Sequence, residues 1–69
     1  MPERLANRLK ERRTERGWTQ AELAERVGVT RKTVNTVENG VFVPSALLAL
    51  KLARALGQPV ELLFWLSEG

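Results

Sequence analysis

A chain of 69 residues with a net charge of +3 and 43% hydrophobic residues has the size and composition of one small globular domain. It contains no cysteine and no histidine, which excludes disulfides, thiolate–metal sites and the commonest general base. The apolar run at residues 62–66 is too short to span a bilayer, and no signal peptide is evident. We therefore expect a soluble cytoplasmic protein with no membrane association, metal or cofactor.

Glycines and prolines divide the chain into segments of helical length, and none of these segments alternates as a strand would. Thr19 followed by Glu22 is a capping box, and Thr30 and Ser45 are further N-cap residues. These signals predict helices over residues 3–16, 20–27, 31–39, 46–56 and 60–66. The predicted fold is all-α, a compact five-helix bundle that forms a single domain over residues 1–69.

Residues 20–37 carry the pattern of two helices joined by a tight turn. Ala24 is small enough for the helices to approach closely, and Gly28 accepts a positive φ in the turn. Val34 and Val37 lie three residues apart, the spacing of a buried helical stripe. The pattern predicts a helix-turn-helix formed by the second and third helices.

With Val34 and Val37 facing inward, the 100° step of the helix places the intervening polar residues on its outer face. Arg and Lys hydrogen-bond the edge of guanine, Asn pairs with adenine, and Thr contacts a thymine methyl or a phosphate. All of the net positive charge also lies in residues 1–40. We therefore expect double-stranded DNA as the partner, contacted by Arg31, Lys32, Asn35 and Thr36.

The sequence resembles the Cro/lambdoid-repressor-like helix-turn-helix regulators, also called the xenobiotic-response-element family. The segments that carry the resemblance are RLKERRTERG (8–17), WTQAELAERVGVTRKTVNTVENG (18–40) and VPSALLALKLARALGQPVELLF (43–64). The resemblance implies that the third helix lies in the major groove and that Gln20 touches DNA at the start of the second helix. It further implies phosphate contacts from Thr19, Thr33 and Asn39, and a structural ion pair between Arg13 and Glu38.

Apolar residues remain after the predicted core has been filled. In the last predicted helix, Val60, Leu63 and Phe64 fit the inner side, while the other large side chains have no place to pack. An apolar group at a surface usually marks an interface. We expect a homodimer whose interface contains Leu47, Leu62, Trp65 and Leu66.

These observations predict a sequence-specific transcriptional regulator, expected to be a repressor that binds an inverted repeat as a homodimer. Two alternatives keep DNA binding: the DNA-binding part of a larger ligand-sensing regulator, and an antitoxin. A third is a protein-interaction module that does not bind DNA. An enzyme is not expected, because the glutamates are scattered over helix surfaces and there is no aspartate. No small-molecule ligand is evident.

Overall fold

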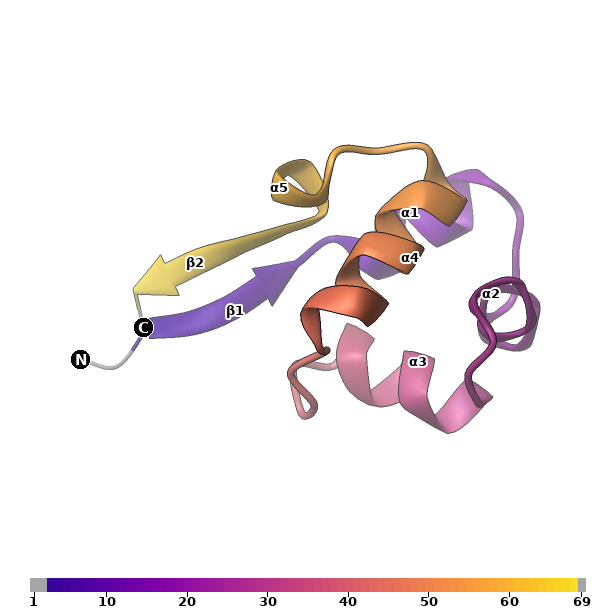
Figure 1. The fold of residues 1–69 in the computed structure, drawn as a ribbon, viewed down its shortest axis with the longest axis horizontal. Helices are drawn as coiled ribbons and strands as arrows, with labels where there is room; N and C mark the ends of the chain where they lie inside the picture. Colours follow the sequence, from indigo (N-terminus) through magenta and orange to yellow (C-terminus); the bar gives the residue numbers. More distant parts are fainter. Residues whose placement is uncertain (1–2, 69) are drawn as a thin grey trace.

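Five helices and one two-stranded antiparallel sheet make up the part of the chain that the computed structural model describes, residues 3–68. In chain order the elements are β1 (Glu3–Asn7), α1 (Leu9–Glu15), α2 (Gln20–Val27), α3 (Arg31–Glu38), α4 (Ala46–Leu56), α5 (Val60–Leu63) and β2 (Phe64–Glu68). Figure 1 shows the helices gathered together, with β1 and β2 extending from them as a ribbon. The protein thus has a helical body and a projecting β-ribbon.

The predicted all-α bundle is wrong, because both ends of the described chain form strands. β1 and β2 pair in antiparallel register, with Leu5 directly opposite Leu66. The helix predicted over residues 3–16 begins only at Leu9, and the one predicted over residues 60–66 has a single turn. The fold is a five-helix domain with a β-ribbon, and the helix-turn-helix is retained within it.

Local contacts explain where these two helices give way to strands. The Asn7 side-chain oxygen accepts a hydrogen bond from the Leu9 N–H (3.0 Å), which starts α1 there. The Asn7 side-chain nitrogen donates to the Val37 carbonyl oxygen (3.0 Å) and so ties the end of β1 to α3. Phe64 has extended backbone angles, and aromatic residues favour strands. These contacts leave residues 3–7 and 64–68 free to pair.

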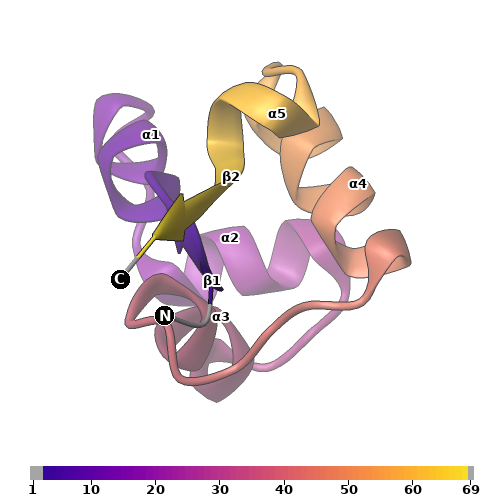
Figure 2. The same cartoon turned by 90° about the vertical axis from the view of Figure 1, so that its left-hand side faces the viewer.

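Every helix contributes to one hydrophobic core in the helical body. Figure 2 shows the body end-on, with the β-ribbon pointing toward the viewer. The ribbon contributes to the core through Phe64, at the start of β2. The buried residues are Leu9, Leu23, Ala24, Val27, Val34, Val37, Leu48, Leu52, Ala53, Leu56, Leu63 and Phe64. A fully buried Leu or Val side chain contributes roughly 1.5–3 kcal/mol, so packing of this core orients α3 against the rest of the body.

The turn between α2 and α3 sets the position of α3, the helix predicted to contact DNA. Gly28 ends α2 with a φ of +74°, a conformation that side chains with a Cβ rarely adopt. Val29 follows, and its N–H donates to the Ala24 carbonyl oxygen (3.0 Å). Thr30 then caps α3 by accepting from the Thr33 N–H (3.2 Å). Three residues therefore reverse the chain and start the next helix.

Candidate nucleic-acid interface

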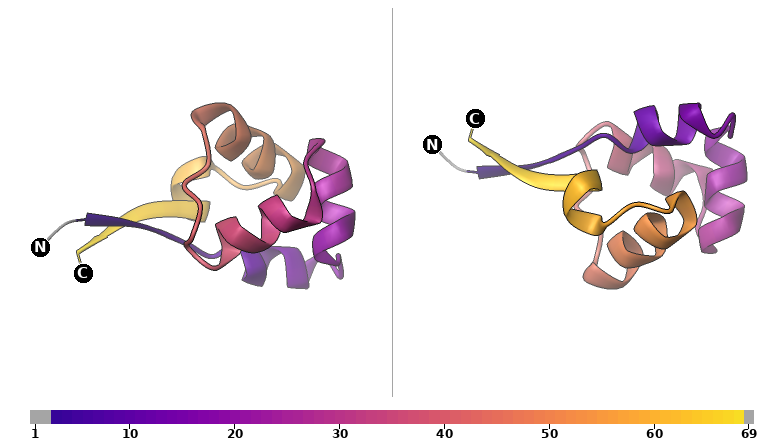
Figure 3. Two further views of the ribbon diagram at one scale, coloured as in Figure 1. Left: turned by 90° about the horizontal axis from the view of Figure 1, so that it is seen from below. Right: turned by 90° about the horizontal axis from the view of Figure 1, so that it is seen from above.

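The outer face of α3 is polar and open. Arg31, Lys32 and Asn35 are exposed, whereas Val34 and Val37 are almost fully buried beneath them. Seen from below, α3 lies at the near surface of the molecule, with no other element in front of it (Figure 3, left). The helix therefore offers two cations and an amide to a ligand while its apolar side holds it in the body.

A buried ion pair fixes α3 against α1. The Arg13 Nε donates to Glu38 Oε2 (2.6 Å), and its Nη2 donates to Glu38 Oε1 (3.2 Å). The two side chains are only 12% and 2% exposed. Arg13 Nη1 also donates to the Trp18 carbonyl oxygen (2.8 Å), which links the pair to the loop before α2. This geometry makes the pair a clamp between three parts of the helical body.

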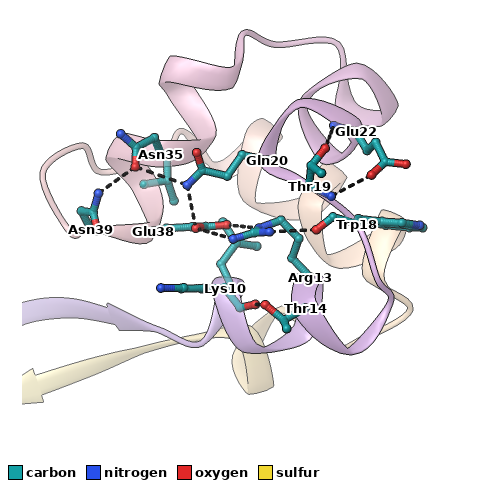
Figure 4. A network of polar contacts seen from close by, with 12 residues as sticks. Lys10, Arg13, Thr14, Trp18, Thr19, Gln20, Glu22, Asn35, Glu38 and Asn39 are labelled. Atoms are coloured by element: carbon teal, nitrogen blue, oxygen red, sulfur yellow. Dashed lines mark hydrogen bonds and ion pairs between the residues drawn. The ribbon is translucent and has the colours of Figure 1, made fainter.

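A chain of side-chain amides runs from this ion pair to the outer face of α3 (Figure 4). Gln20 Nε2 donates to Glu38 Oε1 (3.0 Å) and to Asn35 Oδ1 (3.2 Å). Asn39 Nδ2 donates to the same Asn35 oxygen (2.9 Å). Asn35 is therefore held from both sides. The spacing of Asn35 and Asn39 was the available sequence signal, because residues four apart are neighbours on a helix.

The family of the chain follows from a direct match. A model of the helix-turn-helix family HTH_3 matches residues 9–63, which span α1 to α5. The chain belongs to the HTH_3 helix-turn-helix family. The predicted resemblance to Cro/lambdoid-repressor-like regulators is thereby confirmed.

Curated proteins with sequences similar to this chain include a regulator and an antitoxin. The chain is 48% identical over 64 residues to "Uncharacterized HTH-type transcriptional regulator YgzD" of Bacillus subtilis, covering 93% of this chain and 97% of that protein. It is also 36% identical over 55 residues to "Antitoxin HipB" of Escherichia coli, covering 80% of this chain and 58% of HipB. The helix-turn-helix family and the regulator from Bacillus subtilis confirm the prediction that this chain is not an enzyme.

Solved structures share this helix-turn-helix fold. The restriction-modification controller protein C.AhdI from Aeromonas hydrophila superposes with a TM-score of 0.74 at 41% identity, covering 78% of this chain and 82% of that one. SinR, described as the master regulator for biofilm formation and solved in complex with DNA, gives 0.73 at 31% identity, covering 78% and 87%. Together the comparisons support a DNA-binding transcriptional regulator.

The threonines predicted to contact DNA already have partners within the domain. Thr19 Oγ1 accepts from the Glu22 N–H (3.0 Å), as a capping box requires. Thr33 Oγ1 lies 3.1 Å from Thr30 Oγ1. The Thr36 hydroxyl donates to the carbonyl oxygens of Lys32 and Thr33, each at 3.0 Å. Their side chains are therefore fixed, and a base would meet Thr36 through its methyl group or its free lone pairs.

Three arginines have structural roles that the sequence did not signal. Arg16 Nη2 donates to the Leu56 carbonyl oxygen (2.8 Å) and so satisfies the end of α4. The Arg8 guanidinium lies over the Trp65 ring, 4.9 Å from its centroid, and joins the start of α1 to β2. Arg12 forms an ion pair with Glu15 within α1 (2.9 Å). These three side chains therefore make contacts that hold the fold together.

The residues predicted for the dimer interface all reach the surface. Leu47, Leu62, Trp65 and Leu66 are between 39% and 66% exposed. Phe42 is 48% exposed in the loop between α3 and α4, and its neighbours Val41 and Val43 are exposed as well. A groove runs between this loop and the β-ribbon. The exposed apolar surface is therefore larger than the sequence predicted.

Within residues 3–68, no three acidic side chains gather into a group that could hold a metal ion. No helix in the same range has both the length and the apolarity to cross a membrane.

The capping box at the start of α2 predicts a pH-dependent stability. Hydrogen bonds from the Thr19 backbone and then its side chain lower the pKa of Glu22. A lowered folded-state pKa stabilises the domain above the unfolded-state pKa of about 4.3, and the stabilisation is lost as the pH falls through the folded value. Glu22→Gln keeps an acceptor for the Thr19 N–H but cannot titrate.

We expect Glu22→Gln to lower the thermal midpoint slightly at pH 7 and to equal the parent protein near pH 2. Thermal unfolding followed by circular dichroism across this range measures the difference. Glu25→Gln on the same helix is the matched control, and its difference from the parent should not follow this course. A Glu22→Gln difference that stays constant with pH would contradict the role given to the carboxylate.

Proposed function

We propose that this protein regulates transcription by inserting α3 into the major groove of double-stranded DNA. The observation that carries the proposal is the outer face of α3, where Arg31, Lys32 and Asn35 are exposed while the opposite side is packed into the core. These are the side chains best suited to the donor and acceptor pattern of base edges. The structural similarity to SinR, which was solved with DNA, supports the same partner.

The proposed contacts divide into two groups. Arg31, Lys32, Asn35 and Thr36 face the bases. Thr19, Thr33 and Asn39 flank them and face the phosphates. Gln20 belongs to the interface at the start of α2, but its side-chain nitrogen is already donated to Glu38 and Asn35. The Gln20 side chain therefore positions Asn35, and its remaining oxygen can accept from a base amino group but cannot bond a phosphate oxygen.

We further propose that two copies bind an inverted repeat, with their α3 helices in successive major grooves about 34 Å apart. The exposed apolar residues Leu47, Leu62, Trp65 and Leu66 support a contact between copies. The β-ribbon supports it too, because a two-stranded ribbon is only marginally stable in water unless something packs on it. In the cytoplasm, occupation of promoter DNA by such a dimer would repress transcription.

The proposal is tested by selecting bound sites from a randomised duplex pool at two salt concentrations. We expect an inverted repeat to be enriched, with affinity falling steeply as salt rises, because phosphate contacts release counterions. Binding without enrichment would remove sequence specificity. No binding at either salt concentration would refute the proposal and favour the alternative of a protein-interaction module.

An antitoxin is the second candidate function, because the chain matches most of its length to HipB. The DNA contacts would be the same, and the difference lies in a protein partner. Co-expression with the product of the adjacent gene distinguishes the two. If the two proteins form a stable complex in which the toxicity of the neighbouring gene product is neutralised, the antitoxin function is supported. If no complex forms, the function as a regulator alone is supported.

Arg31→Ala should relax the base preference at one operator position and weaken binding by roughly 1–3 kcal/mol. The reason is that Arg31, exposed at the start of α3, can bond two acceptors of a guanine. Quantitative binding to single-base variants of the selected site measures both effects. Arg54→Ala on α4 is the control, since it removes the same charge from outside α3. An unchanged preference in Arg31→Ala would remove Arg31 from the base-contacting set.

A further inference from the structure

We infer that Asn35 presents only its amide nitrogen to DNA and thereby selects guanine, not adenine, in the operator. The inference rests on the proposed function and makes it more specific. An Asn side chain that is free to turn pairs with adenine by donating to N7 and accepting from the N6 amino group. The hydrogen bonds around Asn35 leave its oxygen unable to accept from the N6 amino group of adenine.

The carboxylate of Glu38 determines which end of the Gln20 amide faces it. An ionised carboxylate has no hydrogen to donate, so any amide atom bonded to it must be a nitrogen. Both Glu38 oxygens accept hydrogen bonds from the Arg13 guanidinium, and the Glu38 side chain is only 2% exposed. The terminal group of Gln20 lies 3.0 Å from Glu38 Oε1 and must therefore face it with Nε2. The orientation of the Gln20 amide is thus fixed by a charge.

The Gln20 amide passes this orientation to Asn35. Gln20 Nε2 carries two hydrogens, and the second is donated to Asn35 at 3.2 Å. The Asn35 atom that receives it must be the oxygen. Asn39 Nδ2 donates to the same oxygen at 2.9 Å. Both lone pairs of Asn35 Oδ1 are therefore occupied inside the protein.

Only the amide nitrogen of Asn35 remains available to a ligand. In Figure 4 the Asn35 oxygen faces Gln20 and Asn39, and the nitrogen points away from both. Asn35 is exposed at this point of α3. Two N–H donors without a free acceptor fit the O6 and N7 acceptors of guanine, whereas adenine offers one acceptor and an amino group that would stay unpaired. The preferred base is therefore guanine.

The experiment uses the operator selected in the previous test. The operator position at which Asn35→Ala loses its base preference is the position that Asn35 contacts. There the parent protein should bind guanine and inosine equally, because both carry O6 and N7, and should bind adenine roughly 5- to 100-fold more weakly. Competition binding on duplexes that differ only at that base gives these ratios.

Gln20→Met tests the anchoring step. It cuts the link to the carboxylate, so the Asn35 and Asn39 amides can turn together, and the discrimination against adenine should fall to less than about threefold. Asn39→Ala leaves the Gln20 link in place and should keep the guanine preference whatever its effect on affinity. Thermal unfolding of both variants checks that the domain remains folded.

Failure of this inference can be distinguished from failure of the proposed DNA-binding function. An adenine preference at the Asn35 position, an unchanged preference in Gln20→Met, or no relaxed position in Asn35→Ala would each overturn the inference while DNA binding stands. Failure of the parent protein to bind any duplex would overturn the proposed function, and the inference with it.

Discussion

Arg13→Ala is expected to lower the free energy of unfolding by about 3–5 kcal/mol, because it leaves the Glu38 carboxylate buried without its partner. The Glu38 side chain is 2% exposed and accepts two hydrogen bonds from Arg13. The Trp18 carbonyl oxygen loses a donor in the same variant. A domain of this size has roughly 3–5 kcal/mol of net stability, so the variant should be largely unfolded at 25 °C.

Urea unfolding of the parent and thermal scans of both proteins measure this loss, which corresponds to a fall in the thermal midpoint of roughly 12–40 °C. Glu15→Ala is the matched control. It breaks the ion pair with Arg12, which lies within α1 and is open to solvent, and should cost less than about 1 kcal/mol. Equal losses in the two variants would contradict the clamp role of Arg13.

A double variant distinguishes the destabilisation caused by an unpaired buried charge from the destabilisation caused by lost side-chain packing. Arg13→Met combined with Glu38→Leu removes both charges and keeps apolar volume, and replacing a buried pair in this way is often neutral for stability. We expect it to be more stable than Arg13→Ala, although Gln20 loses its anchor. A double variant as unstable as Arg13→Ala would show that side-chain packing, not the stranded carboxylate, dominates.

The helix-turn-helix was predictable because its signals are local. Thr19 caps α2, Gly28 turns the chain, and Val34 and Val37 pack at a spacing that one helix face imposes. Each signal depends on residues within a few positions of one another, so periodicity and caps are sufficient to find it. The outer face of α3 follows from the same helical step.

The β-ribbon was not predictable in this way. Leu5 and Leu66 pair across nearly the whole chain, and the apolar residues on either side fit a helix as well as a strand. The two-stranded pairing depends on Asn7 and Phe64 directing both ends out of the helical body. Local propensity carries no information about such a partner, so the all-α class followed from an incomplete signal.

The amide chain was missed for a related reason. The spacing of Asn35 and Asn39 is visible in the sequence, but the bond from Gln20 depends on how α2 crosses α3. A sequence identifies which side chains lie on the outer face and not which of their atoms remain free. The base preference of Asn35 could therefore be inferred only from the structure. The sequence predicts that Asn35 pairs with adenine, whereas our proposal is that it selects guanine.

Leu66→Glu is expected to convert the proposed dimer into a monomer and to reduce affinity for a two-half-site operator by roughly 100-fold or more. Linking two binding modules raises overall affinity by about 10²–10⁴-fold without any new contact, and separating them loses that gain. Leu66 is 66% exposed and lies opposite Leu5 in the ribbon, so a charge there costs little in the isolated chain. In a symmetric interface the same charge would be buried twice.

Light scattering gives the mass of each protein in solution, and binding to duplexes with one or two half-sites separates dimerisation from base contact. Leu66→Met is the matched control, because it keeps an apolar side chain and should remain dimeric. In Leu66→Glu, affinity for a single half-site should be unchanged, since α3 and its anchoring residues are untouched. A dimer that persists in Leu66→Glu would place the contact between copies elsewhere, and the exposed Phe42 and Val43 would then be the first residues to substitute.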